Sequence, residues 1–159
     1  MNGTIGCNCS IADDKFCHIT SFSLTANRLS GNIPGYLAKF TGLTYLSLES
    51  NQFSGVVPPE LSKLASLEIL ILSSNNLVGT LPEALAQIKN LTDLVLRNIN
   101  LNETIPEEAW SVGTTLDLTF NKLVGELPRD TILREFTFLS GNMLTGTVPE
   151  SFIQSNQYL

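Results

Sequence analysis

Residues 43–64 read LTYLSLESNQFSGVVPPELSKL, and this stretch decides the fold. Apolar side chains stand at fixed distances on both sides of Asn51, at Leu43, Leu46, Leu48, Phe53, Val57, Leu61 and Leu64. The LxL portion predicts a short strand. The Gly-x-Val-Pro step after it predicts a turn into an extended return path and a short helical turn, because glycine accepts unusual backbone angles and proline fixes its own. So short a stretch cannot fold alone, so we interpret it as one unit of a stack.

The same unit recurs along the chain. The position of Asn51 recurs every 24 residues and is occupied in successive units by Asn27, Asn51, Asn75 and Ile99. Asn121 and Asn142 follow at spacings of 22 and 21 residues. This period is typical of a solenoid, in which the strands of successive coils align into a parallel sheet. We therefore predict about six repeats over 19–152, after a partial cysteine-containing cap at 1–18 and before an uncapped tail at 153–159.

The fourth unit, LVLRNINLNETIP at 94–106, departs from the pattern, with Ile99 in place of asparagine and Glu103 in place of glycine. An inward asparagine can satisfy buried backbone groups of its own and the adjacent coil, whereas isoleucine cannot. An unpaired group costs about 1–3 kcal/mol, and burial of isoleucine offsets this by about 1.5–3 kcal/mol. We interpret Ile99 as a tolerated structural gap rather than a working site, and we expect Glu103 to alter the local turn.

Composition excludes several classes of function. The chain has 159 residues, 43% hydrophobic and 15% charged, with a net charge of -6, which suits a single compact domain. Only nine Lys and Arg residues occur and they are scattered, so we expect no nucleic acid partner. Apolar stretches such as LEILIL at 67–72 are far shorter than the roughly 18 residues that span a bilayer, so we expect no membrane contact by this segment. No signal segment follows Met1, so we expect no export address within the chain.

No catalytic pattern is found in the sequence. The single histidine, His18, lies beside the cysteines, and neither a phosphate-binding glycine loop nor a kinase signature occurs. The acidic pairs Asp13-Asp14 and Glu107-Glu108 fall in predicted turns, where solvation explains them better than acid–base catalysis. We predict that this chain is not an enzyme and needs no cofactor.

The three cysteines all lie in CNCSIADDKFCH at 7–18. Cysteines separated by one residue rarely bridge each other, so Cys17 is expected to pair with Cys7 or with Cys9, leaving one thiol that needs a partner from elsewhere. The alternatives are free thiols or a zinc site that includes His18, although this spacing matches no usual zinc arrangement.

Sequons for N-glycosylation occur at Asn2, Asn8, Asn90 and Asn102. They are consistent with passage through the secretory pathway. Asn90 and Asn102 fall outside the predicted strands of the main sheet, where glycans would leave its open face free, whereas Asn8 lies between two cysteines.

The pattern LxxLxLxxNxLxGxIPxxLxxL over 19–152 resembles the plant-type leucine-rich repeat. CNCS and CHIT in 7–20, LVLRN at 94–98 and LDLTFNKLVGELP at 116–128 further resemble the ectodomains of plant receptor-like kinases that join such repeats to a malectin domain. The resemblance implies a right-handed α/β solenoid with a parallel sheet on its concave face and extended, 3-10 or short helical turns on its convex side. It also implies an extracellular location, as part of a receptor at the plasma membrane, and an upstream cysteine that would pair with the remaining thiol.

Outward strand positions should align on the open sheet face. The expected columns are Ser21, Tyr45, Ile69, Asp93, Thr115 and Phe136, and Ser23, Ser47, Ile71, Val95, Asp117 and Phe138. We predict that ligands bind here, at Tyr45, Glu49, Ile69, Ile71, Asp93, Val95, Arg97, Asn98 and Phe120. The shortened late coils leave open whether Phe136 and Phe138 point inward instead.

Two functional hypotheses follow. In the first, the chain is an extracellular recognition module that binds a protein co-receptor or peptide, or, as the resemblance implies, a cell-wall oligosaccharide. In the second, it is a free secreted protein, such as an inhibitor of wall-degrading enzymes or an ice-binding protein. Ice binding favours a flat ladder of Thr or Asn, and such inhibitors usually carry cysteine pairs at both ends, neither of which this sequence has.

Overall fold

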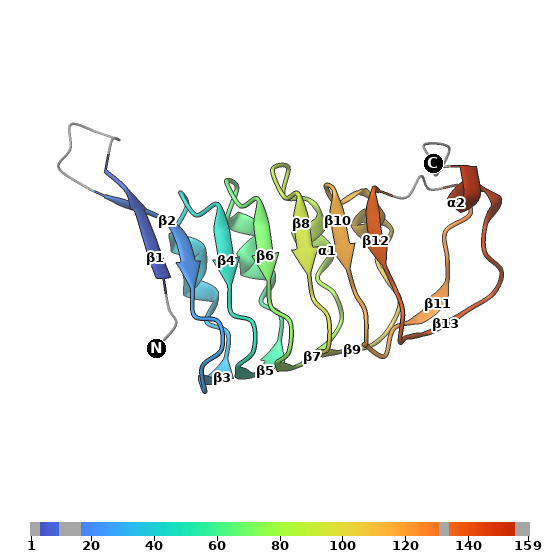
Figure 1. The fold of residues 1–159 in the computed structure, drawn as a ribbon, viewed down its shortest axis with the longest axis horizontal. Helices are drawn as coiled ribbons and strands as arrows, with labels where there is room; N and C mark the ends of the chain where they lie inside the picture. The colour runs from blue at the N-terminus through green and yellow to red at the C-terminus, as the bar shows by residue number, and fades with distance from the viewer. Residues whose placement is uncertain (1–3, 10–16, 131–133, 155–159) are drawn as a thin grey trace.

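The computed structural model describes residues 4–9, 17–130 and 134–154 and forms a solenoid of stacked coils (Figure 1). One sheet runs along its whole length. In spatial order its strands are β1 (Thr4–Asn8), β2 (His18–Ser23), β4 (Tyr45–Ser47), β6 (Ile69–Ile71), β8 (Asp93–Val95), β10 (Thr115–Asp117) and β12 (Phe136–Phe138). Neighbouring strands from β2 to β12 are parallel, as the repeat predicts, and β1 pairs antiparallel with β2.

A second set of strands, which the repeat pattern does not predict, runs along one edge of the solenoid (Figure 1). It comprises one sheet of β3 (Ser30–Asn32), β5 (Gln52–Val56), β7 (Asn76–Gly79) and β9 (Asn100–Leu101), and another of β11 (Val124–Glu126) and β13 (Met143–Thr145). Each strand follows the ladder position of its coil. The start of the return path therefore forms strand pairs between successive coils, because its backbone groups lie beside those of the next coil.

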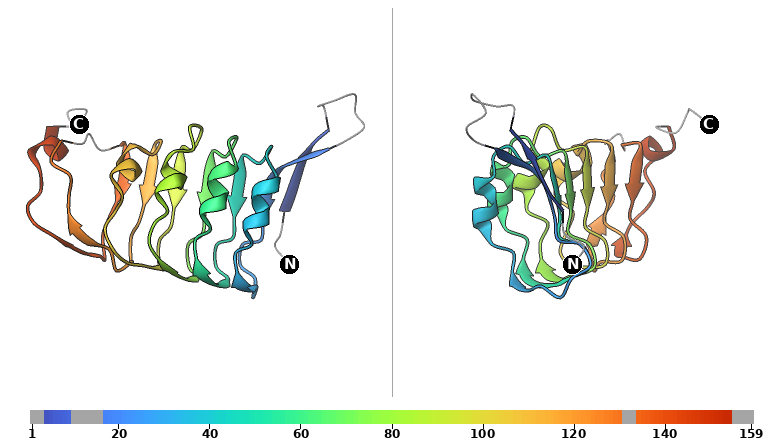
Figure 2. Two further views of the ribbon diagram at one scale, coloured as in Figure 1. Left: turned by 180° about the vertical axis from the view of Figure 1, so that it is seen from behind. Right: turned by 60° about the vertical axis from the view of Figure 1, so that its left-hand side comes forward.

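Short helical segments lie on the side opposite the long sheet, seen from behind in Figure 2. They are η1 (Gly35–Lys39), η2 (Pro59–Lys63), α1 (Glu83–Ala86), η3 (Glu107–Ser111) and α2 (Glu150–Gln154). The first four begin directly after Pro34, Pro58, Pro82 and Pro106, which are the N-cap residues and have ψ between 118° and 145°, so each proline ends the extended path before the helical turn. None of the helices in the described part of the chain is long and apolar enough to cross a membrane.

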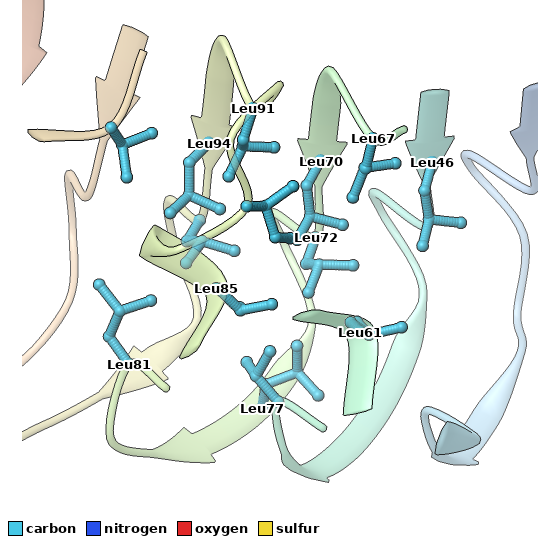
Figure 3. Close-up of a cluster of buried hydrophobic side chains, with 14 of the residues drawn as sticks. Leu46, Leu61, Leu67, Leu70, Leu72, Leu77, Leu81, Leu85, Leu91 and Leu94 are labelled. Carbon is cyan, nitrogen blue, oxygen red and sulfur yellow. The ribbon is translucent and has the colours of Figure 1, made fainter. Parts of the chain in front are cut away.

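The core is the narrow space between the sheet and the helical segments, filled mostly by leucines (Figure 3). The seven apolar positions predicted from residues 43–64 are all buried. In Figure 3, Leu46, Leu70 and Leu94 point inward from successive strands of the long sheet, and each is fully buried. Each such side chain contributes about 1.5–3 kcal/mol relative to an exposed one, and each packs against the coil beside it, so the stack is cooperative.

A ladder of asparagines joins the coils. The side-chain nitrogen of Asn75 donates to the carbonyls of Leu72 and Ser73 in its own coil and of Leu48 in the preceding one, at 2.9, 3.2 and 3.0 Å. Its side-chain oxygen accepts the N–H of Phe53 at 3.0 Å. The same roles are filled in other coils by Asn51, Asn121 and Asn142. The predicted role of the repeated asparagine is confirmed, and it survives the shorter spacing of the late coils.

Ile99 is 2% exposed and occupies the ladder position without any polar group. Leu72 O accepts from Asn75, and Leu96 O accepts from Asn121 at 2.8 Å, so both carbonyls keep one bond to the ladder. By the 24-residue period, Leu77 corresponds to Phe53, whose N–H donates to the side-chain oxygen of Asn75. The gap therefore removes few bonds, in keeping with a structural interpretation.

Glu103 keeps the backbone conformation of the glycines it replaces. Its φ is 67°, whereas Gly79 and Gly125 in the neighbouring coils have φ of 89° and 97°. The left-handed region costs a residue with a Cβ about 1–2 kcal/mol. At this coil β9 is only two residues long, and the two short sheets are joined by the isolated bridge between Thr104 and Val124. The expected change in the local turn is not seen in its backbone angle, because Glu103 keeps a positive φ.

The cap region contains one disulfide, between Cys9 and Cys17, which is one of the two expected pairings. Cys7 is free and exposed on β1. Asn2, the Asp13-Asp14 pair and residues 155–159 of the predicted tail lie outside the described residues.

Candidate functional site

The open face of the long sheet displays the predicted columns in the predicted register. Tyr45 pairs with Ile69, Ile69 with Asp93, and Asp93 with Thr115. In the second column, Ile71 pairs with Val95 and Val95 with Asp117. Paired residues of adjacent parallel strands share a face, so each column is a continuous row of side chains.

The edge strand β12 continues both columns, because Phe136 pairs with Thr115 and Phe138 with Asp117. The two phenylalanines are 45% and 47% exposed, so they point outward and the alternative of an inward slip is wrong. The loss of residues in the late coils falls in the return path, and the strand register is unaffected.

One predicted outward residue is not available to a ligand. Ser47 is 1% exposed, and its hydroxyl lies 2.8 Å from that of Thr25, which in turn lies 3.1 Å from that of Ser23. The prediction that Ser47 faces solvent is therefore wrong, because this row of hydroxyls ties neighbouring strands together and covers a small side chain.

An apolar patch lies at the centre of the face. It consists of Ile69, Ile71 and Val95, each half-buried by its neighbours. Asp93 and Asp117 border it: Asp93 accepts a hydrogen bond from the Thr92 hydroxyl at 2.7 Å. Asp117 accepts from both the N–H and the hydroxyl of Thr119, at 3.0 and 2.7 Å. The threonines hold each carboxylate in place while its other oxygen remains able to accept a bond from a partner.

The residues that follow the strands add charge. Glu49 is half-buried and Arg97 is exposed, two coils apart, with the buried Ser73 between them. The Ser73 hydroxyl donates to Val95 O at 3.2 Å and accepts the N–H of Arg97 at 3.1 Å, which fixes the backbone at Arg97. The predicted residues Glu49 and Arg97 therefore lie at the same edge of the face. They are not in adjacent coils, because Ser73 of the intervening coil separates them.

Asn98 and Phe120 lie apart from the columns, at the rim where the chain turns into the ladder. Both have positive φ, 52° and 56°, as do Ser50 and Ser74 at the equivalent positions. Both are exposed, Phe120 by 65%. The left-handed turn directs these side chains away from the core instead of onto the columns.

This rim forms a hollow of 330 Å³ around the coil that carries Ile99, which we call the rim hollow. Its lining residues are Ser74, Asn75, Asn76, Asn98, Ile99, Asn100, Phe120, Asn121 and Lys122. Asn98 and Phe120 were predicted as binding residues, whereas Ser74, Asn76, Asn100 and Lys122 were not. Their signal in the sequence is their position, since each directly precedes or follows a ladder residue.

The geometry thus offers two surfaces with different chemistry. The sheet face combines an apolar patch, fixed carboxylates and exposed aromatic rings, which suits a peptide or protein surface. The rim hollow combines amides, one lysine and one aromatic ring, which suits a small ligand rich in hydroxyl groups. In the described part of the chain, no group of three or more His, Cys, Asp and Glu side chains is arranged to hold a metal ion.

The leucine-rich-repeat family model matches residues 17–77. The structure resembles the Arabidopsis receptor kinase HAESA, solved with the peptide hormone IDA and the co-receptor SERK1, at 38% identity and a TM-score of 0.73 over 79% of this chain and 22% of that one. It also resembles a chain of the BIR3–SERK2 complex from Arabidopsis thaliana, at 29% identity and a TM-score of 0.71 over 91% and 78% of the two chains.

A plant ice-binding protein is similar as well, with 25% identity and a TM-score of 0.70 over 79% of this chain and 50% of that one. No match to this chain is found among curated proteins. This chain spans only 19% to 24% of the length of the matching chains in three further receptor structures. The chain therefore has the leucine-rich-repeat fold that these plant receptor structures share.

Proposed function

We propose that this chain is part of the extracellular recognition module of a plant receptor-like kinase, and that its open sheet face binds a peptide or a co-receptor ectodomain. The observation that carries the proposal is the in-register patch of Ile69, Ile71 and Val95 beside Asp93 and Asp117. HAESA, which has the same fold, is described with both a peptide hormone and a co-receptor.

The chemistry of the face favours a partner with apolar and basic groups. The apolar patch would form the desolvated centre of the interface, where binding energy concentrates. Asp93 and Asp117, held by Thr92 and Thr119, would accept hydrogen bonds from Lys or Arg of the partner. The net charge of -6 would speed the approach of a basic segment and make association sensitive to salt.

The finer assignment, to receptors that join leucine-rich repeats to a malectin domain, is supported only by the sequence resemblance of CNCS and CHIT in 7–20, LVLRN at 94–98 and LDLTFNKLVGELP at 116–128. In that case the exposed Cys7 would pair with a cysteine outside this chain, and 1–18 would be part of the cap. A membrane helix and a kinase domain outside this chain belong to this proposal as well, because the resemblance is to the ectodomains of receptor-like kinases.

A short cell-wall oligosaccharide is the second candidate ligand, and the rim hollow is the observation that favours it. Phe120 offers a ring on which a sugar can stack, and Asn98, Asn100 and Lys122 offer hydrogen bonds around it. A free secreted protein is the third possibility, and the ice-binding protein shares the fold. The mixed columns of the face, with Ile69, Asp93 and Phe136 in one row, provide no flat ladder of Thr or Asn for ice.

Four variants separate these functions. Ile71→Glu places a charge in the apolar patch, Asp93→Ala removes a carboxylate from the face, and Asn98→Ala removes an amide from the rim hollow. Val78→Glu is the control matched to Ile71→Glu. It also replaces an apolar side chain by a charged one, but Val78 lies on β7, outside the open face, and is 44% exposed. The measurements are pull-downs with co-receptor ectodomains and peptide ligands, and calorimetric titration with cello-oligosaccharides.

A protein partner would be lost with Ile71→Glu, weakened with Asp93→Ala and retained with Val78→Glu. An oligosaccharide would be lost with Asn98→Ala and retained with Ile71→Glu. If all four variants bind every tested partner as the parent does, recognition does not occur on the open face or at the rim, and the proposal is wrong.

A further inference from the structure

We infer that Asn102 carries an N-linked oligosaccharide, so that the coil that breaks the repeat displays a glycan directly after its edge strand β9. The inference requires only that the chain passes through the secretory pathway, as the proposed extracellular placement entails. It does not depend on which ligand binds the open face.

The three residues of the sequon Asn102-Glu103-Thr104 are all exposed. The preceding residue, Leu101, ends β9 and is fully buried, whereas Asn102 directly after it is exposed. The backbone holds the site in place, because the N–H of Asn102 donates to Gly79 O at 3.0 Å and Thr104 bridges to Val124. The acceptor asparagine is therefore displayed to solvent on a fixed backbone.

The neighbouring coils differ at this point. Val78 and Val124 occupy the position of Asn102, followed by Gly79 and Gly125 at the position of Glu103. The two valines are 44% and 37% exposed, and their strands flank the segment from Asn100 to Thr104. Val78 pairs with Asn100 and Val124 pairs with Thr104, so each valine lies opposite a residue two positions from Asn102. A glycan on Asn102 would shield these exposed apolar side chains from water and from other chains.

The other described sequons are more constrained. The side-chain nitrogen of Asn90 donates to Ala65 O of the preceding coil at 2.8 Å. Asn8 ends β1, opposite His18 and beside the Cys9–Cys17 disulfide. The side chain of Asn102, by contrast, makes no hydrogen bond within the described part of the chain, so substitution of its nitrogen breaks no contact of the fold.

The modification is a group transfer from a polyprenyl-diphosphate oligosaccharide. The side-chain nitrogen of Asn102 forms a bond to the anomeric carbon of the first sugar, the bond from that carbon to the diphosphate oxygen breaks, and the nitrogen loses one proton. The lipid diphosphate leaves with the bonding electrons, and no oxidant or reductant is needed. The Thr104 hydroxyl supplies the third residue of the acceptor sequon.

The position of the glycan separates it from the proposed ligand surface. β9 lies along the edge of the solenoid, whereas β8 of the same coil lies in the long sheet, as Figure 1 shows. A glycan on Asn102 would therefore leave the patch of Ile69, Ile71 and Val95 accessible.

The test is expression of the 159-residue chain behind a secretion signal in plant or insect cells, followed by glycopeptide mass spectrometry with and without peptide N-glycosidase. Asn102→Gln and Thr104→Val should each remove the mass of one oligosaccharide from the intact protein. Thr104→Ser should retain it, because serine preserves the sequon. Circular dichroism of the secreted variants checks that each is folded.

An unmodified Asn102 in folded protein whose Asn90 or Asn8 is glycosylated would overturn the inference, as would secreted protein with no glycan at any sequon. Partner binding is a separate readout. A chain that is glycosylated at Asn102 but binds no partner would contradict the proposed function alone, whereas an unmodified chain that binds a partner would contradict the glycan alone.

Discussion

Exchange of the residues at ladder positions 75 and 99 tests how the coils are joined. Asn75→Ile creates a second gap beside the natural one, and Ile99→Asn closes the natural gap. Both sites are buried, at 5% and 2% exposure, so the two changes are matched in environment. We expect opposite outcomes, because one change removes hydrogen bonds in use and the other supplies bonds that the ladder lacks.

The magnitudes follow from the bonds at each site. Asn75→Ile removes the acceptor of Phe53 N–H and the ladder donor to Leu72 O. Each buried group left unpaired costs about 1–3 kcal/mol, and the added apolar burial returns about 1.5–3 kcal/mol. We expect a net loss of about 2 kcal/mol. In Ile99→Asn the gain at Leu77 N–H and the loss of apolar burial nearly cancel, so we expect stability unchanged or raised by up to about 1 kcal/mol.

Urea unfolding followed by circular dichroism measures both changes, with the slope reporting the surface exposed on unfolding. A clear fall in midpoint for Ile99→Asn at unchanged slope would refute the tolerated-gap account and show that the surroundings are shaped around isoleucine. An unchanged midpoint for Asn75→Ile would refute the larger claim that the ladder stabilises the stack.

Three further predictions concern the turn, the cap and the open end. Glu103→Gly should raise the free energy of unfolding by about 0.5–1 kcal/mol, because glycine adopts the positive φ of this position without strain. Gly31→Glu makes the opposite change at φ 85°, with open space where the Cβ would lie, and should lower the free energy of unfolding by about 1–2 kcal/mol. Unfolding midpoints equal to that of the parent would contradict both expectations. In native protein a maleimide should label Cys7 alone, and it should label Cys9 and Cys17 only after their disulfide is reduced. Cys17→Ser should lower the free energy of unfolding by about 2 kcal/mol, because the short loop closed by the disulfide is then open in the unfolded state. In the described part of the chain β12 and β13 end their sheets, and Phe136, Phe138 and Met143 are exposed there. The 159-residue chain should therefore self-associate, or exchange its amide hydrogens quickly over 136–148. A strict monomer by light scattering at high concentration, with slow amide exchange over these residues, would count against this prediction.

Much of the fold can be predicted from sequence because each coil repeats the same local problem. The distances of Leu46, Leu48 and Phe53 from Asn51 determine which side chains point inward, and a constant period then places equivalent residues side by side. The register of the open face follows for the same reason, from Tyr45 beside Ile69 to Asp93 beside Thr115. The ladder asparagines and the positive φ at Gly55 and Gly79 are equally local consequences of residue type.

The tertiary structure alone decided the features that depend on contacts between coils. The edge strands β3 to β9 exist because backbone groups of one return path meet those of the next, which no residue in the sequence signals. Ser47 is buried by hydroxyl contacts across strands. The pairing of β1 with β2, which sets Asn8 opposite His18, brings Cys9 beside Cys17, and the rim hollow forms where turns from three coils meet. Periodicity determines the direction of a side chain within its own coil, whereas burial, pairing and hollows depend on distances between coils, which only the assembled stack sets.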